Sequence, residues 1–346
     1  MLTTTSDSPS LPSRETGRNS SSEPIIGEPE YLSECSPKDR PWDIHRAQAD
    51  QVATIYLSAD DSRWFRRLGE RVRMCSEVLQ FGWSPDGCGV LTLKLRQAWF
   101  CRVRHCCVCQ WRRSLMWMAR FREAFPRVLA QSPKARFVFL TVTIRNVRIN
   151  ELGGTLRQMS TAWGRLVKRT EFASVVGWIR AVEVTRGRDG SAHPHYHVLL
   201  MVPAGYFRQS EKKYVTQPEW AAAWRESLRV DYEPIVHVTA VKPKRAAWLD
   251  GRPTTGLVDA ARETFKYAVK PGDMIADPQW FLELTRQLHK RRFIASGGIL
   301  KDVLRENDET NDDLLLLGEG QPDEGAGFYF DWWRPVRRYK RRGSIQ

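Results

Sequence analysis

The stretch VVGWIRAVEVT at residues 175–185, followed by HPHYHVLLMV at residues 193–202, decides the fold of this chain. Both segments are rich in branched and aromatic side chains, which favours β-strands. They are joined by RGRDGSA, in which Asp189 and Gly190 are typical turn residues. The two segments are therefore predicted to pair as a β-hairpin.

Further elements are predicted on both sides of this hairpin. Thr216 can cap a helix that has Pro218 in its first turn. In chain order, the predicted elements are a strand at 136–144, a helix at 151–170, the two strands of the hairpin, a helix at 217–228, a strand at 236–242 and a helix at 257–269. This order matches an α+β fold of the ferredoxin-like or RRM-like kind, an antiparallel sheet with helices on one face. The other face is then open for a site.

Three of the seven histidines, His193, His195 and His197, lie two residues apart in the second strand of the hairpin. Because successive side chains of a strand point to opposite faces, all three imidazoles are expected on one face. Two of them can share one divalent ion, to which Glu183 on the preceding strand can add a carboxylate. A row of solvated or core-bonded histidines is the alternative, but this clustering favours a metal site.

The segment ETFKYAVKP sets Glu263 and Tyr267 four residues apart on the helix predicted over 257–269, so both side chains are expected on one helix face. Lys266 and Lys270 flank the tyrosine. With an intrinsic pKa of about 10, a tyrosine attacks at neutral pH only beside a cation or a base and on a polarised substrate. By itself this segment is more typical of a core tyrosine beside a solvated glutamate and lysine.

The segment CRVRHCCVC has the spacing Cys101-x4-Cys106-x2-Cys109, and its last step is that of a zinc knuckle. The fourth ligand is open: Cys75, Cys88, His105 and Cys107 are the candidates. Cys75 is preferred because it precedes a separate apolar segment that the metal would tie down. Structural zinc is favoured over buried free thiols.

Residues 96–122 contain seven arginines and three tryptophans without any Asp or Glu. Arginines with interleaved aromatic residues suit phosphates and stacked bases. A solvated helix face, with arginine stems lying over tryptophan, is the alternative. The residues predicted to bind DNA are Arg102, Arg104, Trp111, Arg112 and Arg113.

The composition is that of a basic globular protein. The 346 residues carry a net charge of +14, 42% of them are hydrophobic, and 14 Trp with 14 Phe exclude uniform disorder. The apolar runs are shorter than the ~18 residues of a membrane span, and the first residues show no apolar signal core. The few, crowded cysteines suit reduced thiols. We expect a cytoplasmic protein whose polyanionic partner is nucleic acid rather than a membrane.

Composition also divides the chain into four regions. Residues 1–40 are rich in Ser, Thr and Pro and are predicted to be a disordered tail. Residues 41–130 form the Cys-rich basic region that is predicted to bind DNA, and residues 131–300 contain the predicted sheet and the histidines. Residues 301–346 are predicted to be an acidic linker and a basic aromatic C-terminal tail.

In this order, FLTVTI, HPHYHVLL and ETFKYAVKP resemble the three motifs of rolling-circle plasmid replication initiators within the HUH endonuclease superfamily. CRVRHCCVCQWRRSL is similar to the Cys-rich segment of the single-tyrosine branch of that family, with Cys107 where proline is usual. The resemblance covers roughly residues 65–300. In mobilisation relaxases the tyrosine precedes the histidine motif. Since Tyr267 follows it, an initiator or a transposase-like enzyme is favoured.

The resemblance implies a site-specific DNA nicking and joining enzyme with the HUH endonuclease fold. Tyr267 is then the nucleophile that keeps the 5′ end as a phosphotyrosine, and the released 3′ hydroxyl primes a polymerase. His195 and His197 are expected to hold Mg²⁺ or Mn²⁺. Glu183 is preferred over His193 as the third ligand, because hard Mg²⁺ prefers oxygen.

The resemblance also implies roles for residues around the tyrosine. Part of the single-tyrosine branch has a glutamate four residues before the tyrosine, which is thought to activate a water that ends replication, and Glu263 matches it. The alternative is a solvated helix carboxylate that offsets Lys266 and Lys270. Lys270 is expected in the catalytic group as a cation beside the phenol.

The expected partner is plasmid origin DNA, as a single strand or a hairpin at the nick site. The sequence has no G-x-x-x-x-G-K-[ST] motif, so a host helicase is expected as a partner along with a host DNA polymerase. The rival hypothesis is a non-catalytic, zinc-containing DNA-binding regulator. That rival explains the charge and the cysteines, but not the three spaced histidines followed by an ordered tyrosine.

Overall fold

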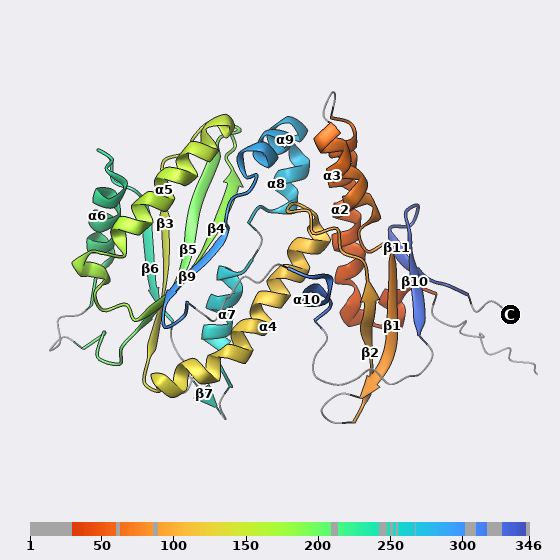
Figure 1. The fold of residues 1–346 in the computed structure, drawn as a ribbon, viewed down its shortest axis with the longest axis horizontal. Coiled ribbons are helices and arrows are strands. Elements are labelled where there is room, and N and C mark those ends of the chain that lie inside the picture. Colours follow the sequence, from red (N-terminus) through yellow and green to blue (C-terminus); the bar gives the residue numbers. More distant parts are fainter. Residues whose placement is uncertain are drawn as a thin grey trace, which may run out of the picture.

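The computed structural model of the chain describes residues 30–59, 63–85, 89–208, 214–241, 248–249, 252–253, 255–266, 268–301, 309–316 and 327–343. Two antiparallel sheets lie on either side of a long helix, α4 (Cys107–Gln131), drawn in yellow in Figure 1. Most of the predicted N-terminal tail lies outside the described residues. Its last part includes the short helices α1 (Leu32–Cys35) and η1 (Pro37–Asp39).

The larger sheet forms around the predicted hairpin. β4 (Gly177–Arg186) pairs antiparallel with β5 (Ala192–Val202), β3 (Arg136–Thr143) pairs with the other side of β5, and β6 (Val236–Ala240) pairs with β3. The predicted α+β class with an antiparallel sheet is confirmed. One strand of this sheet was not predicted: β9 (Ile294–Gly298) pairs with β4, and its sequence IASGG has little of the β-branched character that marks strands.

Two helices cover one face of this sheet as predicted. α5 (Leu152–Leu166) and α6 (Gln217–Leu228) lie on the side to which Tyr196 points. The centroid of the Tyr196 ring is 6.1 Å from that of Trp163 in α5 and 6.3 Å from that of Trp224 in α6. These aromatic contacts form the core on this side of the sheet.

The opposite face, on which the histidines lie, is partly covered as well. Phe125 of α4 packs there, with its ring centroid 5.6 Å from that of Phe137, which shares a sheet face with His197. α7 (Thr255–Thr264) contacts both β5 and α4. The last predicted helix is therefore shorter than expected and lies across the sheet from α5 and α6. The face that was expected to be open is therefore partly covered by α4 and α7.

The second sheet joins the two ends of the described chain. β1 (Val78–Pro85) and β2 (Leu91–Ala98) form a hairpin, and the other edge of β1 pairs with β10 (Phe328–Trp333), which pairs with β11 (Arg338–Arg341). The expectation of a C-terminal tail therefore does not hold for these two strands. The physical reason is that their aromatic side chains alternate into the core, where the buried ones are Phe330, Trp332 and Tyr339.

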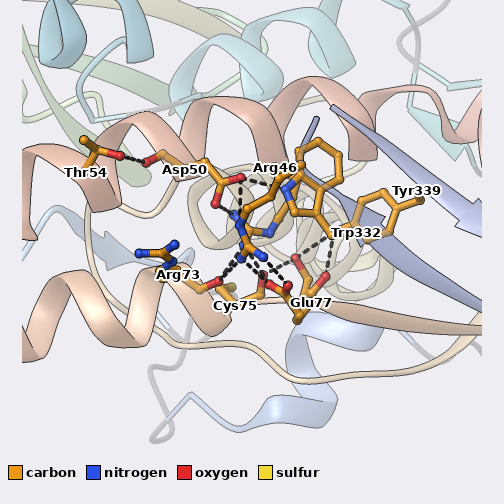
Figure 2. A network of polar contacts seen from close by, with 10 residues as sticks. Arg46, Asp50, Thr54, Arg73, Cys75, Glu77, Trp332 and Tyr339 are labelled. Carbon is orange, nitrogen blue, oxygen red and sulfur yellow. Dashed lines mark hydrogen bonds and ion pairs between the residues drawn. The ribbon is translucent and has the colours of Figure 1, made fainter. Parts of the chain in front are cut away.

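A buried polar network attaches this sheet to α2 (Pro41–Leu57). Arg46 of α2 is fully buried and forms ion pairs with Asp50, at 2.7 Å, and with Glu77, at 3.0 Å (Figure 2). The indole nitrogen of Trp332 donates a hydrogen bond to Asp50 over 2.6 Å. Because the Arg46 guanidinium is buried, loss of its carboxylate partners would leave an uncompensated charge, so these contacts link the C-terminal strands to the N-terminal helix.

Short elements connect these layers. They are α3 (Arg63–Met74), η2 (Ile149–Glu151), η3 (Thr170–Phe172), β7 (Trp248–Leu249), β8 (Arg252–Pro253), α8 (Pro271–Ala276), α9 (Pro278–Gln287) and α10 (Asn311–Leu315). Within the described ranges, no helix combines the length and the apolar character that a bilayer span requires.

Candidate active site

Three of the predicted metal ligands meet on β4 and β5. Glu183 lies opposite His195 in the strand register, and His197 shares the face of His195. Glu183 Oε2 is 2.8 Å from His197 Nε2 and 3.2 Å from His195 Nε2, and the two nitrogens are 3.2 Å apart. One oxygen and two nitrogens thus converge, as ligands of one divalent ion do. Among the described residues, this group includes Glu183 and not the partly exposed His193.

Contacts behind the imidazoles orient them. His195 Nδ1 lies 3.3 Å from the carbonyl oxygen of His193, which can only accept a hydrogen bond, so a proton on Nδ1 would leave Nε2 to ligate a metal ion. His197 Nδ1 lies 3.3 Å from the hydroxyl of Thr141 on β3, and its ring stacks on Phe139. Such outer contacts fix the tautomer of metal-binding histidines. Thr141 was not predicted, because only the pairing of β3 with β5 brings it to His197.

Glu183 is buried yet held in its ionised form. Burial by itself raises the pKa of a carboxyl group. Hydrogen bonds from His195 and His197, together with the ammonium of Lys266 at 3.0 Å, outweigh burial and hold the pKa of Glu183 below its ordinary value. The ionised carboxylate is the form that binds a hard cation, so the group has the charge that a divalent ion requires.

Tyr267, the predicted nucleophile, lies outside the described residues, but both of its neighbours contact the strand that carries the cluster. Lys266 contacts Glu183, and the carbonyl oxygen of Ala268 accepts a hydrogen bond from the amide of Val184 over 2.8 Å. The chain on either side of position 267 is therefore held beside Glu183.

The other two predicted catalytic residues differ in their distance from the cluster. Glu263, in the last turn of α7, forms an ion pair with Lys266, and its Oε1 lies 4.0 Å from His197 Nε2. Lys270 is exposed and immediately precedes α8. Glu263 therefore lies at the edge of the cluster, while the role of Lys270 stays a prediction.

Four cysteines form a second candidate metal site. Cys75, just after α3, joins Cys101, Cys106 and Cys109, and the four sulfurs lie within 4.8 Å of one another. Cys109 Sγ is 3.6 Å from Cys75 Sγ and 3.6 Å from Cys101 Sγ. Tetrahedral zinc, with Zn–S bonds of about 2.3 Å, would hold its sulfurs about 3.8 Å apart. The spacing therefore fits a tetrahedral four-sulfur metal site.

The protonation of these buried thiols also suits a cation. Burial raises the pKa of Cys75 and Cys101. Burial acts on Cys106 too, but hydrogen bonds from the neighbouring thiols hold its pKa below the ordinary value. A buried thiolate requires a compensating positive charge. Of the other candidate ligands, Cys107 and His105 are buried outside this group and Cys88 lies outside the described residues.

Two of the predicted DNA-binding residues form contacts within the protein instead. The guanidinium of Arg112 is buried and donates to the carbonyl oxygens of Leu314, at 2.7 Å, and Leu315, at 2.8 Å. The ring of Trp111 packs edge-on against Trp42, with centroids 4.9 Å apart. The burial of Arg112 is at odds with the prediction that it binds DNA, because this face of α4 packs against α10.

The other three, Arg102, Arg104 and Arg113, line a cleft of about 960 Å³ between the Cys-rich segment and the larger sheet. Six further basic residues line this cleft: Arg71, Arg120, Lys266, Lys290, Arg291 and Arg292. Arg120 belongs to the basic segment 96–122 and Lys266 flanks Tyr267, but the other four were not predicted from the sequence. The basic run KRR at 290–292 was a signal for three of them.

Known proteins match most of this chain in sequence. The sequence model of a family described as "Replication protein" matches residues 92–340. A "Protein rep" from Lactiplantibacillus plantarum is 36% identical over 293 residues, which cover 82% of this chain and 87% of that protein. A "Protein rep" from Streptococcus pneumoniae serotype 2 is 33% identical over 296 residues, covering 84% and 88%. The chain belongs to the replication-protein family.

A shorter relative also supports membership of this family. A "Replication protein" from Staphylococcus aureus is 32% identical over 212 residues, covering 58% of this chain and 87% of that protein. No solved structure shows a significant match. The family range 92–340 includes the Glu183 cluster, Tyr267 and three of the four clustered cysteines. The resemblance to plasmid replication initiators is thus confirmed at the level of the family.

Proposed function

We propose that this replication protein initiates rolling-circle replication of a plasmid by nicking and rejoining one DNA strand at the origin. The main support is the convergence of Glu183, His195 and His197 beside the residues that flank Tyr267. A carboxylate with two imidazoles suits a divalent cation that can bind a phosphate, and a tyrosine nearby suits covalent phosphoryl transfer.

The proposed reaction needs no ATP, because each bond that forms is matched by a bond that breaks. A Mg²⁺ or Mn²⁺ ion bound by Glu183, His195 and His197 would polarise the scissile phosphate. The phenol of Tyr267 loses its proton and its oxygen forms a bond to phosphorus, while the bond from phosphorus to the 3′ oxygen breaks. The 5′ end stays on the protein as a phosphotyrosine. The 3′ oxygen takes up a proton and becomes the primer hydroxyl.

Charged neighbours would assist both steps. Lys266 precedes Tyr267 and contacts Glu183, and its positive charge, with that of Lys270, would favour the phenolate. Glu263, whose Oε1 is 4.0 Å from His197 Nε2, would accept a proton from the water that later hydrolyses the phosphotyrosine.

The cysteine cluster would hold one structural Zn²⁺, because closed four-sulfur sites in proteins are structural. The substrate would be origin DNA, single-stranded or as a hairpin at the nick site. A helicase and a DNA polymerase of the host would supply unwinding and synthesis, since the sequence has no P-loop motif. The proposal locates this activity in the cytoplasm.

The test is the covalent adduct. Purified protein with Mn²⁺ and an oligonucleotide that carries its own origin is expected to give a protein–DNA band on a denaturing gel. Tyr267→Phe removes one oxygen, so the fold should survive and the band disappear. Tyr329→Phe, an exposed tyrosine of the second sheet, is the matched control and should form the adduct normally.

Two results would contradict the proposal. An adduct that persists in Tyr267→Phe would assign the nucleophile to another residue, with Tyr214 and Tyr232 the first to examine. A wild-type protein that binds its origin but never nicks it would favour the non-catalytic regulator.

A further inference from the structure

A cationic cleft opens beside the proposed nicking centre. It has a volume of about 960 Å³, and it is lined by residues of α4 and the Cys-rich segment on one side and of the end of α7 and the segment before β9 on the other. Among the described residues that line it, nine are basic and a single one, Glu309, is acidic. Such a charge imbalance in a concave site attracts a polyanion.

The cleft is continuous with the Glu183 cluster. Lys266 lines the cleft, and its ammonium contacts Glu183. Ala181 and Val182, which precede Glu183 on β4, line it too, as does Ala268 on the other side of position 267. A polyanion bound in the cleft can therefore extend to the proposed nicking centre along the protein surface.

The contacts of Glu309 indicate which chemical group the cleft binds. Its carboxylate pairs with Arg113 through two bonds, Nε to Oε2 at 2.6 Å and Nη2 to Oε1 at 2.8 Å. Its backbone carbonyl oxygen accepts a hydrogen bond from Arg102 over 2.8 Å. An arginine fork binds carboxylate and phosphate groups in the same bidentate way. The Glu309 carboxylate thus occupies a position that suits a backbone phosphate.

We infer that the cleft binds the sugar-phosphate backbone of single-stranded DNA next to the nick site, and that Glu309 holds one phosphate position until the strand displaces it. The inference rests on the proposed function for the centre to which the cleft leads. Proteins that read duplex DNA insert a helix or a β-ribbon into a groove. Here the cations line the walls of a cleft, and proteins that bind single strands likewise hold the backbone in a basic groove.

Binding of a labelled oligothymidylate of about 16 nucleotides to the full-length protein tests the cleft by fluorescence anisotropy. Lys290→Ala combined with Arg292→Ala removes two exposed cleft cations. This variant should bind more weakly, and the slope of log K against log salt should become shallower by about 0.7 for each phosphate that it no longer neutralises. Arg127→Ala combined with Lys134→Ala removes the same charge from exposed positions outside the cleft. An equal decrease in affinity in both variants would overturn the inference.

Glu309→Gln tests the displaced carboxylate. Glutamine keeps the size but loses the charge, so the variant is expected to bind oligothymidylate about fivefold more tightly, which is the difference between a charge-assisted and a neutral hydrogen bond. Glu123→Gln makes the same charge change at an exposed position of α4 and should change the affinity much less. A Glu309→Gln protein that binds no more tightly than Glu123→Gln contradicts this role of Glu309.

Two further measurements separate this inference from the proposed function. Oligothymidylate has no origin sequence, so Tyr267→Phe should bind it like the wild type. A protein that fails to nick its origin but shows the cleft effects would refute the nicking proposal and leave the cleft assigned. A duplex of the same length that competes as well as the single strand would overturn the single-strand assignment.

Discussion

The two candidate metal sites differ in ligands, burial and surroundings. The cysteine cluster offers four buried sulfurs around one point, whereas the Glu183 cluster offers one oxygen and two nitrogens beside a cationic cleft. Closed sulfur sites stabilise folds, and oxygen and imidazole sites that keep open positions bind substrates. We therefore expect the cysteine site to support the structure and the Glu183 site to perform the proposed chemistry, and mutations can separate the two roles.

Loss of a histidine ligand should have the largest effect on chemistry. His195→Ala or His197→Ala is expected to lower nicking by more than the roughly 100-fold that loss of an outer-shell partner can cost. DNA binding and the melting temperature should change little, because affinity comes from the basic surface. Nicking and anisotropy assays measure the two effects, with the exposed His289→Ala as the control. Wild-type nicking in either variant would remove the histidines from the site.

Loss of a cysteine should act on the fold instead. Wild-type protein is expected to keep about one equivalent of zinc after mild EDTA treatment that abolishes Mn²⁺-dependent nicking. Cys106→Ser should lose that zinc, melt at a lower temperature and give less folded protein, since a buried sulfur ligand is removed. Elemental analysis and thermal unfolding measure this. A zinc-free wild-type protein with an unchanged melting temperature would refute the structural role.

Loss of a contact behind the histidine ligands should have an intermediate effect on nicking. Thr141→Val keeps the side-chain shape but removes the hydroxyl that lies 3.3 Å from His197 Nδ1. The Mn²⁺ concentration for half-maximal nicking should rise about tenfold, at the low end for such partners. Thr239→Val, an exposed position on the neighbouring strand, should leave it unchanged. Equal values for the two variants would mean that Thr141 does not orient the imidazole.

The smallest effect on nicking is expected at the edge of the cluster. Glu263→Gln keeps the size of the side chain but loses its basicity, so initial nicking should stay near the wild-type rate. Termination should fail, because no base activates the water. Gel analysis of replication products should then show multimeric single strands in place of unit-length circles. Unit-length circles at the normal rate would make Glu263 a solvated helix carboxylate.

Local sequence predicted the parts of the fold whose signals are short-range. The β4–β5 hairpin, α5 and α6 follow from alternation, helical spacing and capping within each segment. Strand β9 and the pairing of β10 with β1 were missed, since β1 and β10 are some 250 residues apart along the chain and no local pattern specifies a partner at that separation.

The residues of the candidate sites also fall into those that the sequence predicted correctly and those that it did not. Cys75 was expected to complete the cysteine cluster and Glu183 the histidine site, and the structure brings both into the groups where ligand atoms converge. Arg112 was expected at a DNA surface, yet it is buried against α10, because a helical wheel does not show which face a distant segment will cover.

The sequence alone determined which residue types lie on one face of one strand, the spacing of the cysteines and the basic charge, since these depend on neighbours a few positions apart. Only the tertiary structure decided that Thr141 supports His197, that Glu309 pairs with Arg113 and that basic residues far apart along the chain line one cleft. Those contacts depend on how strands and helices pack. Packing is set by the burial of apolar surface over the whole chain and not by any single motif.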